Sequence, residues 1–399
     1  MQAHDFRLNS IIIHYHEIAL KKGNRPLFIR RFIENIRQAI SGLGLREITT
    51  PRGRVVLYLK ENASWDAVVD RLRQVFGIAN FAPAWCGERD IDTLEKIVLS
   101  FLPEKNFKSF CIAARREDKQ YPMISMEVNE RLGSLVQEKT GARVDLTHPE
   151  MIFHVEILTK KALIYCDKFK GPGGLPVGVS GSVMALLSGG IDSPVASYRM
   201  MKRGCRVHFI HFHGAPFLSK ASLEKAQELV AHLTPYQFQS KLHLVPFGEI
   251  QRQIVLTIPP PLRVVLYRRF MLRIAEAMAV REGAKALITG DSVGQVASQT
   301  LENIATIQEA ASMPILRPLI GSDKEEIIEQ ARAIKTYDIS ILPDQDCCQL
   351  FIPAHPSVAA EIDAVHQEEM KLDIQGLVAM GLNNIETRRF RSPSHMDGG

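Results

Sequence analysis

The stretch ALLSGGIDSPVASYRMM, residues 185–201, decides how the second half of this chain folds. The apolar run that leads into it, residues 183–187, is typical of a buried strand, and the residues after Ser193 have the composition of a helix. The motif SGGIDS therefore occupies a tight turn between a strand and a helix. Gly189 and Gly190 allow a close backbone approach and a positive φ at this turn.

A turn of this kind suits a phosphate group. In an open α/β sheet, ligands lie beyond the carboxyl ends of the strands. Amide groups at the start of a helix point outward without intrahelical partners, and the helix dipole favours an anion there. Because Ser188 and Ser193 add hydroxyl donors, we expect the turn to bind phosphate. The alternative is a serine- and glycine-rich turn that holds no ligand.

The composition is that of a globular protein with a sizeable core. Of the 399 residues, 46% are hydrophobic and 23% are charged, and no apolar run is long enough to span a membrane. The first residues lack the basic start and apolar core of a secretory signal. Six cysteines without any CxxC spacing indicate reduced thiols rather than a disulfide framework or a zinc ribbon. We therefore expect a cytoplasmic protein without a membrane anchor.

The positive charge is concentrated near the N-terminus. Residues 1–80 contain 13 Lys and Arg against 7 Asp and Glu, whereas residues 81–176 are balanced at 14 each. The run LKKGNRPLFIRRF at 20–32 lies at the centre of this excess. Such a run is typical of a surface that binds a phosphate backbone, although a solvated helix face is the alternative.

The order of expected elements predicts three parts. Strands and amphipathic helices alternate in a ferredoxin-like α+β order over 1–76, and a second α+β unit covers 77–168. Six Gly or Pro residues among the eight of 171–178 indicate a linker. Apolar strands alternate with helices over 177–392, which predicts a parallel, doubly wound sheet. The tail TRRFRSPSHMDGG, 387–399, reads as disordered.

Neither GxxxxGK[ST] nor GxGxxG after a strand is present, so a Walker-type site is excluded and a dinucleotide fold is unsupported. SGGIDS after an apolar strand instead resembles the PP-loop of ATP pyrophosphatases. Further stretches resemble one family, the tRNA 4-thiouridine synthetases (ThiI): HYHEIALKKGNRPLF, GDSVGQVASQTLENI, LRPLIGSDKEEII and DQDCCQLFIPAHP. The resemblance implies an N-terminal ferredoxin-like domain, a tRNA-binding THUMP domain and a C-terminal, Rossmann-like PP-loop domain.

The family resemblance also implies a reaction. ATP adenylates O4 of uridine 8 in tRNA, a persulfide sulfur attacks C4, and AMP leaves, which gives 4-thiouridine. Some members also supply sulfur for the thiazole of thiamine. ATP and Mg²⁺ are the implied cofactors, because a carboxylate that faces a triphosphate needs a cation between them. No protein ligand set for a metal is predicted.

The residues that match the family's motifs fall into three groups. The expected catalytic residues are Asp192, Lys324, Cys347 and Cys348. The expected nucleotide-binding residues are Leu186, Leu187, Ser188, Gly189, Gly190, Ser193, His211, Phe212, Arg268, Gly290 and Gln299. The expected RNA-binding residues are Lys21, Lys22, Arg30, Arg31, Arg115, Arg116 and Lys119.

Several of these residues have a second interpretation. Leu186 and Leu187 also suit a plain core, and Arg268 also suits a salt bridge on a helix. Asp323, next to Lys324, suits a helix N-cap.

Cys347 and Cys348 are the adjacent pair, and Cys348 is the expected persulfide carrier, with Cys347 the alternative. Cys86, Cys111, Cys166 and Cys205 lie in or beside apolar strands and are expected to be inert core thiols. A three-thiol cluster site from Cys205 and the pair is a weaker alternative.

The sequence contains no segment that resembles the rhodanese-like domain of some family members. We therefore expect sulfur to come from a cysteine desulfurase or a separate persulfide carrier, and we expect a homodimer. Two other functions remain as alternatives: a PP-loop tRNA-modifying ligase of another type, and a tRNA-binding THUMP protein with an inactive nucleotide site. The cysteine pair argues against the first, and the intact SGGIDS with Lys324 argues against the second.

Overall fold

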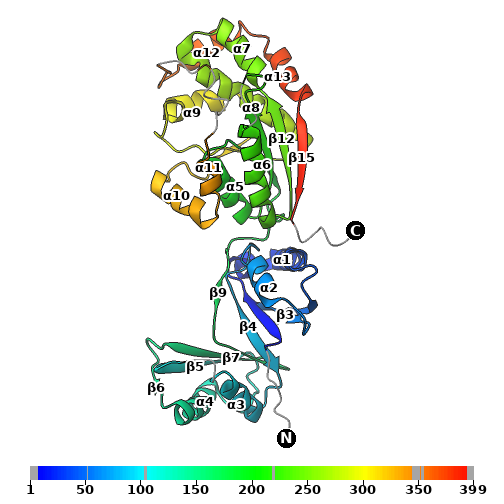
Figure 1. The fold of residues 1–399 in the computed structure, drawn as a ribbon, viewed down its shortest axis with the longest axis vertical. Coiled ribbons are helices and arrows are strands. Elements are labelled where there is room, and N and C mark those ends of the chain that lie inside the picture. The colour runs from blue at the N-terminus through cyan, green and yellow to red at the C-terminus, as the bar shows by residue number, and fades with distance from the viewer. Residues whose placement is uncertain are drawn as a thin grey trace. The chain divides into compact units, whose positions relative to one another are not determined.

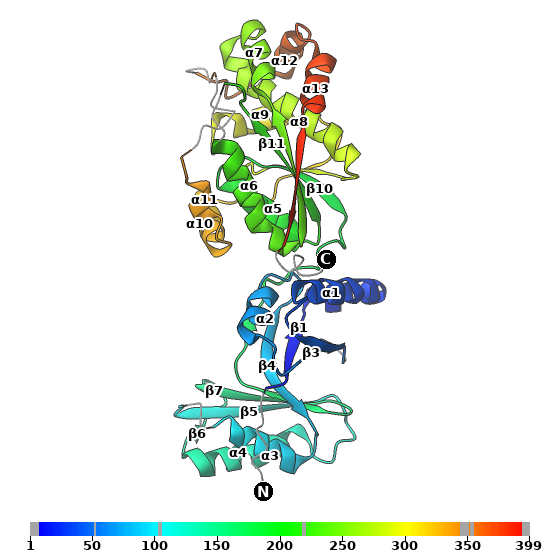
Figure 2. The ribbon, with the colours of Figure 1, turned by 45° about the vertical axis from the view of Figure 1, so that its right-hand side comes forward.

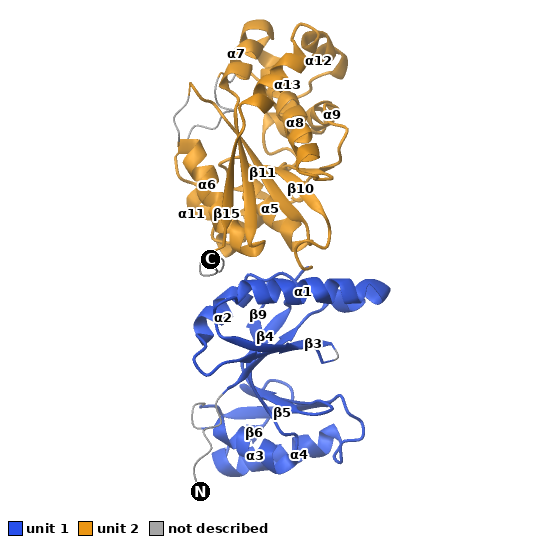
Figure 3. Cartoon of the chain, turned by 90° about the vertical axis from the view of Figure 1, so that its right-hand side faces the viewer, with its two compact units in different colours: residues 1–174 blue, residues 175–399 orange. Residues whose placement is uncertain are grey.

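The computed structural model describes residues 8–51, 53–102, 106–217, 221–343, 351 and 355–392. These residues form two compact units, 1–174 and 175–399, coloured separately in Figure 3. Each unit contains one sheet. Among the described residues, no helix combines the length and the apolar character that crossing a membrane requires.

The first unit contains one extended sheet with two groups of helices (Figure 1). Its strand order is β2-β3-β1-β4-β8-β7-β5-β6, and β9 pairs with β4. Its elements are β1 (Ser10–His14), η1 (Glu17–Asn24), α1 (Arg25–Ala39), β2 (Leu45–Thr49), β3 (Arg54–Leu59), α2 (Trp65–Leu72), β4 (Asn80–Gly87), α3 (Ile91–Ser100), β5 (Ser109–Arg116), α4 (Ser125–Thr140), β6 (Arg143–Val144), β7 (Met151–Ile157), β8 (Ala162–Tyr165) and β9 (Phe169–Lys170).

Strand β4 joins the two halves of this sheet. It pairs with β1 through Asn80–Ala84 and with β8 through Trp85–Gly87, so one continuous strand belongs to both halves. The half that contains β1–β3 has the expected ferredoxin-like alternation of strands and helices, and the other half also combines strands with helices. Strand β1 ends at His14, and the chain turns into a 3-10 helix at Glu17.

The second unit contains a six-stranded sheet in the order β14-β13-β10-β11-β12-β15. Helices α5 and α6 lie on one face, and α7, α8 and α13 lie on the other (Figure 2). Its elements are β10 (Ser182–Leu186), α5 (Asp192–Lys202), β11 (Arg206–His213), α6 (Ala221–Leu233), η2 (Thr234–Tyr236), β12 (Gln239–Pro246), α7 (Gly248–Thr257), η3 (Pro260–Leu262), α8 (Arg263–Arg281), β13 (Leu287–Ile288), η4 (Ala297–Gln299), α9 (Leu301–Gln308), β14 (Ile315–Leu316), α10 (Lys324–Ala333), α11 (Tyr337–Ser340), α12 (Ile362–Glu369), α13 (Ile374–Asn383) and β15 (Glu386–Arg391).

The strand order reverses direction at β10. The chain passes from β10 to β11 on one side, and β13 later pairs with β10 on the other side, both in parallel. A crevice forms at such a switch point, beyond the carboxyl ends of the strands. The loop after β10 lies there.

The expected disorder of the C-terminal tail is wrong for part of that tail. Residues Glu386–Arg391 form β15, which pairs antiparallel with β12, so the sheet is parallel except at this edge. The backbone ladder stabilises β15 although most of its side chains are polar and exposed. His243 Nδ1 and Thr387 Oγ1 also lie 2.9 Å apart between the two strands. Residues 393–399 lie outside the described part.

We predict that truncation of the chain after Asn384 destabilises the second unit. Loss of β15 leaves one edge of β12 without backbone partners. We expect the midpoint of thermal unfolding to fall by roughly 5 °C or more, since 1 kcal/mol corresponds to about 2–4 °C in a unit of this size. Differential scanning calorimetry measures the change. Truncation after Ser392 is the matched control, and an equal midpoint for both truncations would contradict the prediction.

Candidate active site

The loop between β10 and α5 is closed by its two serines. Ser188 N donates to Ser193 Oγ at 3.0 Å, and Gly190 N donates to Ser188 Oγ at 3.3 Å. Gly189 and Gly190 permit a positive φ, but neither residue adopts one here. What these glycines contribute to the loop is therefore the absence of a side chain, which allows a close backbone approach. Helix α5 begins at Asp192, so its first amide groups face the crevice, as the sequence predicts.

Gly290, two residues after the end of the neighbouring strand β13, lies against this loop. A Cβ atom at position 290 would lie 2.9 Å from Ser193 N and 3.0 Å from the carbonyl carbon of Asp192. Both are backbone atoms, which cannot move aside as a flexible side chain can. Position 290 therefore requires glycine if the loop is to keep its place.

A cavity of about 500 Å³ opens beside the loop, which is within the usual range for a small-molecule site. Nine of the expected nucleotide-site or catalytic residues line it: Leu186, Leu187, Ser188, Asp192, Ser193, Phe212, Arg268, Gly290 and Gln299. The sequence did not identify the other lining residues, Val264, Met271, Thr289, Asp291, Val296, Ala297, Ser298 and Pro356. Several of these residues belong to the motif GDSVGQVASQTLENI, residues 290–304, so membership of that motif could have identified them as site residues.

Asp291 organises one wall of the cavity. Its carboxylate accepts a hydrogen bond from Arg268 and one from Thr289 Oγ1 at 2.7 Å, and Arg317 Nε lies 3.3 Å away. Burial alone would raise the pKa of Asp291, but the charges of the two arginines and these hydrogen bonds lower it. Arg268 therefore both faces the cavity and forms the salt bridge that was its alternative interpretation.

Asp192 is held from two other segments. Lys324 Nζ lies 2.7 Å from its Oδ1, and Gln295 Nε2 donates to its Oδ2 at 2.9 Å. Lys324 is the first residue of α10, and Asp323 caps that helix by accepting from Glu326 N, as expected. A carboxylate, a partly exposed ammonium group and an amide thus meet at the N-terminus of α5.

His211 supports the site without lining the cavity. It is buried, and its Nδ1 lies 2.8 Å from the carbonyl oxygen of Leu187. Its position fixes the end of β10 against the next strand. The expected direct contact of His211 with a nucleotide remains a prediction.

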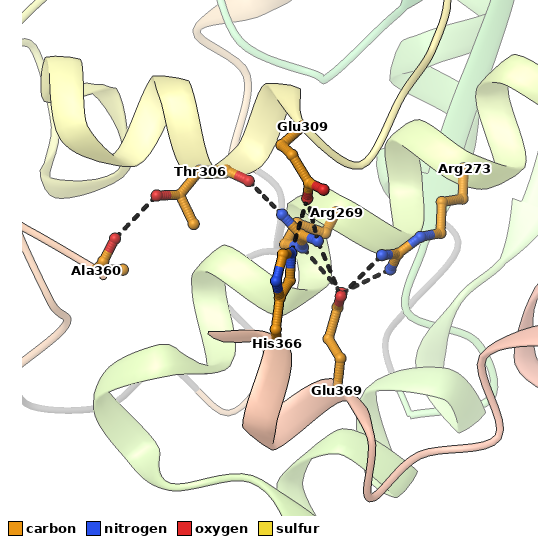
Figure 4. A network of polar contacts seen from close by, with 7 residues as sticks. All are labelled: Arg269, Arg273, Thr306, Glu309, Ala360, His366 and Glu369. Atoms are coloured by element: carbon orange, nitrogen blue, oxygen red, sulfur yellow. Dashed lines mark hydrogen bonds and ion pairs between the residues drawn. The ribbon is translucent and has the colours of Figure 1, made fainter. Parts of the chain in front are cut away.

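An ionic network around the buried Arg269 and Glu369 joins helix α8, which carries Arg268 and Met271 of the cavity wall, to α9 and α12 (Figure 4). Arg269 and Arg273 of α8 both bind the Glu369 carboxylate of α12, at 2.6 to 2.8 Å. Arg269 also binds Glu309 and the carbonyl oxygen of Thr306, so α8, α9 and α12 are joined. Burial raises the pKa of Glu369, but hydrogen bonds and charges of the two arginines outweigh it and lower the pKa to about 2.

Helix α9 also holds the chain that leads into α12. Thr300 Oγ1 donates to Val358 O, Asn303 Nδ2 to Ser357 O, and Thr306 Oγ1 to Ala360 O. Pro356, just before this segment, lines the cavity and follows Cys348 by eight residues. Cys347 and Cys348 themselves lie outside the described residues.

The other cysteines have the surroundings of core thiols. Cys86, Cys111 and Cys205 are buried, and burial raises the pKa of each thiol. Cys166 is partly buried and, like the others, forms no disulfide among the described residues. None of the three buried thiols has the lowered pKa that activates a sulfur nucleophile.

The expected RNA-binding residues lie in the first unit. Lys21 and Lys22 are in η1, Arg30 and Arg31 are in α1, and Arg115 and Arg116 end β5, shortly before Lys119. Most are exposed, whereas Arg31 lies near Glu34 and Arg116 donates to the carbonyl oxygen of Tyr121. Arg115 lines a polar cavity of about 270 Å³.

The parallel sheet, the serine–glycine loop at its switch point and the adjoining cavity define a PP-loop nucleotide-binding unit. The family model "Thiamine biosynthesis protein (ThiI)" matches residues 178–374, the ThiI ferredoxin-like domain matches 10–82, and the THUMP domain matches 88–167. The chain belongs to the ThiI family.

Relatives cover nearly its full length. A probable tRNA sulfurtransferase from Thermus thermophilus is 47% identical over 95% of this chain and 93% of the relative, and one from Moorella thermoacetica is 43% identical over 94% and 96%. A crystal structure of a 4-thiouridine synthetase–RNA complex with bound ATP matches with a TM-score of 0.89 at 34% identity. That match covers 96% of this chain and 100% of the other.

We predict that Glu369→Gln destabilises the second unit by about 3 kcal/mol at pH 7, because it leaves buried guanidinium groups without their carboxylate. The pKa of Glu369 is lowered, so its stabilising effect is present above about pH 4.5 and is lost as the pH falls toward 2. Urea unfolding at several pH values measures this. The exposed Glu329→Gln is the control, and a deficit that does not shrink at low pH would contradict the prediction.

Proposed function

We propose that this protein is an ATP-dependent tRNA sulfurtransferase that converts uridine 8 to 4-thiouridine. The observation that carries the proposal is the cavity beside the loop 188–193, which Asp192 lines and where Lys324 Nζ lies 2.7 Å from the Asp192 carboxylate. The names of the relatives and the ATP- and RNA-bound neighbour support the same activity. The matches of the first unit to the ThiI ferredoxin-like domain and the THUMP domain support a tRNA substrate.

The cavity suits ATP in a particular orientation. The serine-lined loop and the start of α5 offer amide and hydroxyl donors to the phosphates, and Lys324 offers a positive charge. The remaining wall is mostly apolar, with Leu186, Phe212 and Met271, which suits the base and ribose. We assign Ser188, Gly189, Gly190 and Ser193 to the phosphates, and Arg268 and Gln299 to the opposite wall.

The chemistry follows from this placement. O4 of uracil attacks the α-phosphorus of ATP, and pyrophosphate leaves into the loop. A persulfide sulfur then adds to C4, and AMP leaves with the former O4. A persulfide that adds directly leaves a disulfide, which a thiol reductant must cleave. Lys324 and the α5 amide groups stabilise the negative charge that builds on the phosphates.

Mg²⁺ fits this site as a companion of the nucleotide. Among the described residues, no group of three or more His, Cys, Asp or Glu side chains could hold a metal alone. Mg²⁺ usually binds one or two carboxylates together with substrate phosphates, and Asp192 faces the cavity. Asp192 would hold the ion, which supplies charge neutralisation for the phosphates.

The finer assignments rest on the family. We propose that Lys21, Lys22, Arg30 and Arg31, together with the basic residues around Arg115, contact tRNA phosphates. We further propose a cytoplasmic homodimer, a cysteine desulfurase or separate carrier as the sulfur donor, and a contribution to thiamine thiazole synthesis. The domain division at 1–76, 77–168 and 177–392 also remains a proposal.

The direct test is 4-thiouridine formation in unmodified tRNA transcript. The protein is supplied with ATP, Mg²⁺, a thiol reductant and either sulfide or a desulfurase with cysteine. We expect 4-thiouridine at position 8, with pyrophosphate and AMP as products. Pyrophosphate release without any change in the tRNA would contradict the proposed activity.

We predict that Gly290→Ala weakens ATP binding by about tenfold or more. Its Cβ overlaps the backbone of Asp192 and Ser193, and overpacking of this kind costs about 1–3 kcal/mol. Isothermal titration calorimetry with Mg²⁺ and ATP measures the loss. Gly321→Ala is the matched control, because a Cβ there meets nothing within 4 Å. Equal affinities for the two variants would show that the loop tolerates displacement.

We predict that Cys348→Ser loses desulfurase-driven thiolation but keeps ATP- and tRNA-dependent pyrophosphate release. The resemblance to the ThiI family makes Cys348 the expected persulfide carrier of the pair, so loss of its thiol should stop sulfur transfer without affecting adenylation. Cys347→Ser should keep a substantial part of both activities. Bulk sulfide should partly rescue Cys348→Ser. Full desulfurase-driven activity in Cys348→Ser with loss in Cys347→Ser would reverse the assignment.

A further inference from the structure

One face of the second unit's sheet changes character along its strands. On β11, Ile210 and Phe212 pack into the core under α7 and α8. Arg206 and His208 share that face, because side chains on a strand alternate, but they lie toward the other end of the strand. This face of the sheet is therefore apolar at the strand ends near the ATP cavity and basic at the opposite ends of the same strands.

Four cations gather on this part of the face. Lys241 of β12 pairs in register with Arg389 of β15, and Gln239 pairs with Arg391, so the side chains of both pairs lie on one face. Together with Arg206 they line a cavity of about 200 Å³, which His208 also lines. We call Arg206, Lys241, Arg389 and Arg391 the sheet-face basic cluster. The lower ends of β11 and β15 are visible in Figure 3 below α8 and α13.

Lys241 is the one member of the cluster that a carboxylate of the described residues neutralises. Glu282, at the end of α8, binds Lys241 at 2.6 Å and also lies near His208 and His243. Burial lowers the pKa of both histidines, that of His243 to about 4, so neither adds a charge at neutral pH. Arg206, Arg389 and Arg391 are exposed and form no ion pair with a carboxylate among the residues described here.

We propose that the sheet-face basic cluster binds the phosphodiester backbone of the RNA substrate. This proposal rests on the proposed function, which supplies the RNA. A guanidinium group can donate two parallel hydrogen bonds to a phosphate, and three guanidinium groups line this cavity without a carboxylate partner in the described part of the chain. The buried centre of a protein–protein interface is largely apolar, and the cluster offers little exposed apolar surface of that kind.

Protection of an edge strand does not account for the cluster. Charged side chains on an edge strand discourage pairing with another chain. Arg389 and Arg391 lie on the edge strand β15, but Arg206 lies on β11, two strands further in. Arg206 is also about 20 Å from Phe212 of the ATP cavity, since six residues of β11 separate them, so the cluster contacts phosphates distant from the modified base.

The test compares two variants of the full chain. Arg389→Ala with Arg391→Ala removes two cations of the cluster. Arg388→Ala is the matched control, because Arg388 lies on the same strand but points to the other face, where it binds Glu386 and Gln227. Fluorescence anisotropy with unmodified tRNA transcript is measured across a series of KCl concentrations, together with ATP affinity and the midpoint of thermal unfolding.

We expect the double variant to bind tRNA more weakly, with the log–log salt slope reduced by about two, because each lost phosphate contact removes about one. Arg388→Ala should match the wild type, as should the ATP affinity of both variants. Arg206→Ala, on another strand, should reduce the slope by about one. These results together support the cluster as an RNA contact.

Other results overturn it. An unchanged slope in the double variant, or an equal loss in Arg388→Ala, removes the cluster from RNA binding. An unchanged slope with loss of desulfurase-driven thiolation, while sulfide-driven thiolation persists, assigns the cluster to an acidic protein partner instead. Failure of the wild type to bind tRNA at all would overturn the proposed function as well, whereas the preceding outcomes leave that function intact.

Discussion

The close backbone contact between Gly290 and the loop 188–193 is the constraint on which the catalytic unit depends. Strands β13 and β10 pair in parallel, so the segments that follow them leave the sheet side by side. Without a Cβ at position 290, these segments pack backbone to backbone. Asp291 is then placed one residue further on, where it holds Arg268, and Gln295 reaches Asp192 from the same segment. One steric requirement thus sets both the phosphate loop and the opposite wall.

The residues that position the site and those that would contact RNA share a single sheet. Along β11 the same face passes from Arg206 through His208 to Ile210 and Phe212. Helices α7 and α8 cover only the apolar half, and Glu282 at the end of α8 marks where that cover stops. Alternation of side chains therefore builds the core and a basic surface from one strand, without any change in backbone geometry.

The sequence predicted the strand, loop and helix around residues 183–201 and nine of the residues that line the cavity. Both predictions depend on apolar periodicity and turn chemistry, which are encoded in residues close together in the chain. The sequence did not predict β15. That strand is polar and exposed, and its stability comes from backbone pairing with β12, a partner about 145 residues earlier in the chain. The role of Asp291 was missed for a similar reason, since its arginine partners lie on α8 and beyond β14. Interactions between distant segments leave little local pattern to read.

The two kinds of ion pair in this unit suit two different tasks. Glu369 and Arg269 are 5% and 1% exposed, so separating them leaves a buried charge and costs several kcal/mol, as a fixed wall requires. Lys324 and Asp192 are 43% and 20% exposed, and a pair of this kind contributes about 0.2–1 kcal/mol. On the proposed function, an arriving triphosphate can therefore take Lys324 from Asp192 at little cost. The carboxylate that Lys324 leaves then needs another cation, which is the charge that Mg²⁺ would bring with the nucleotide.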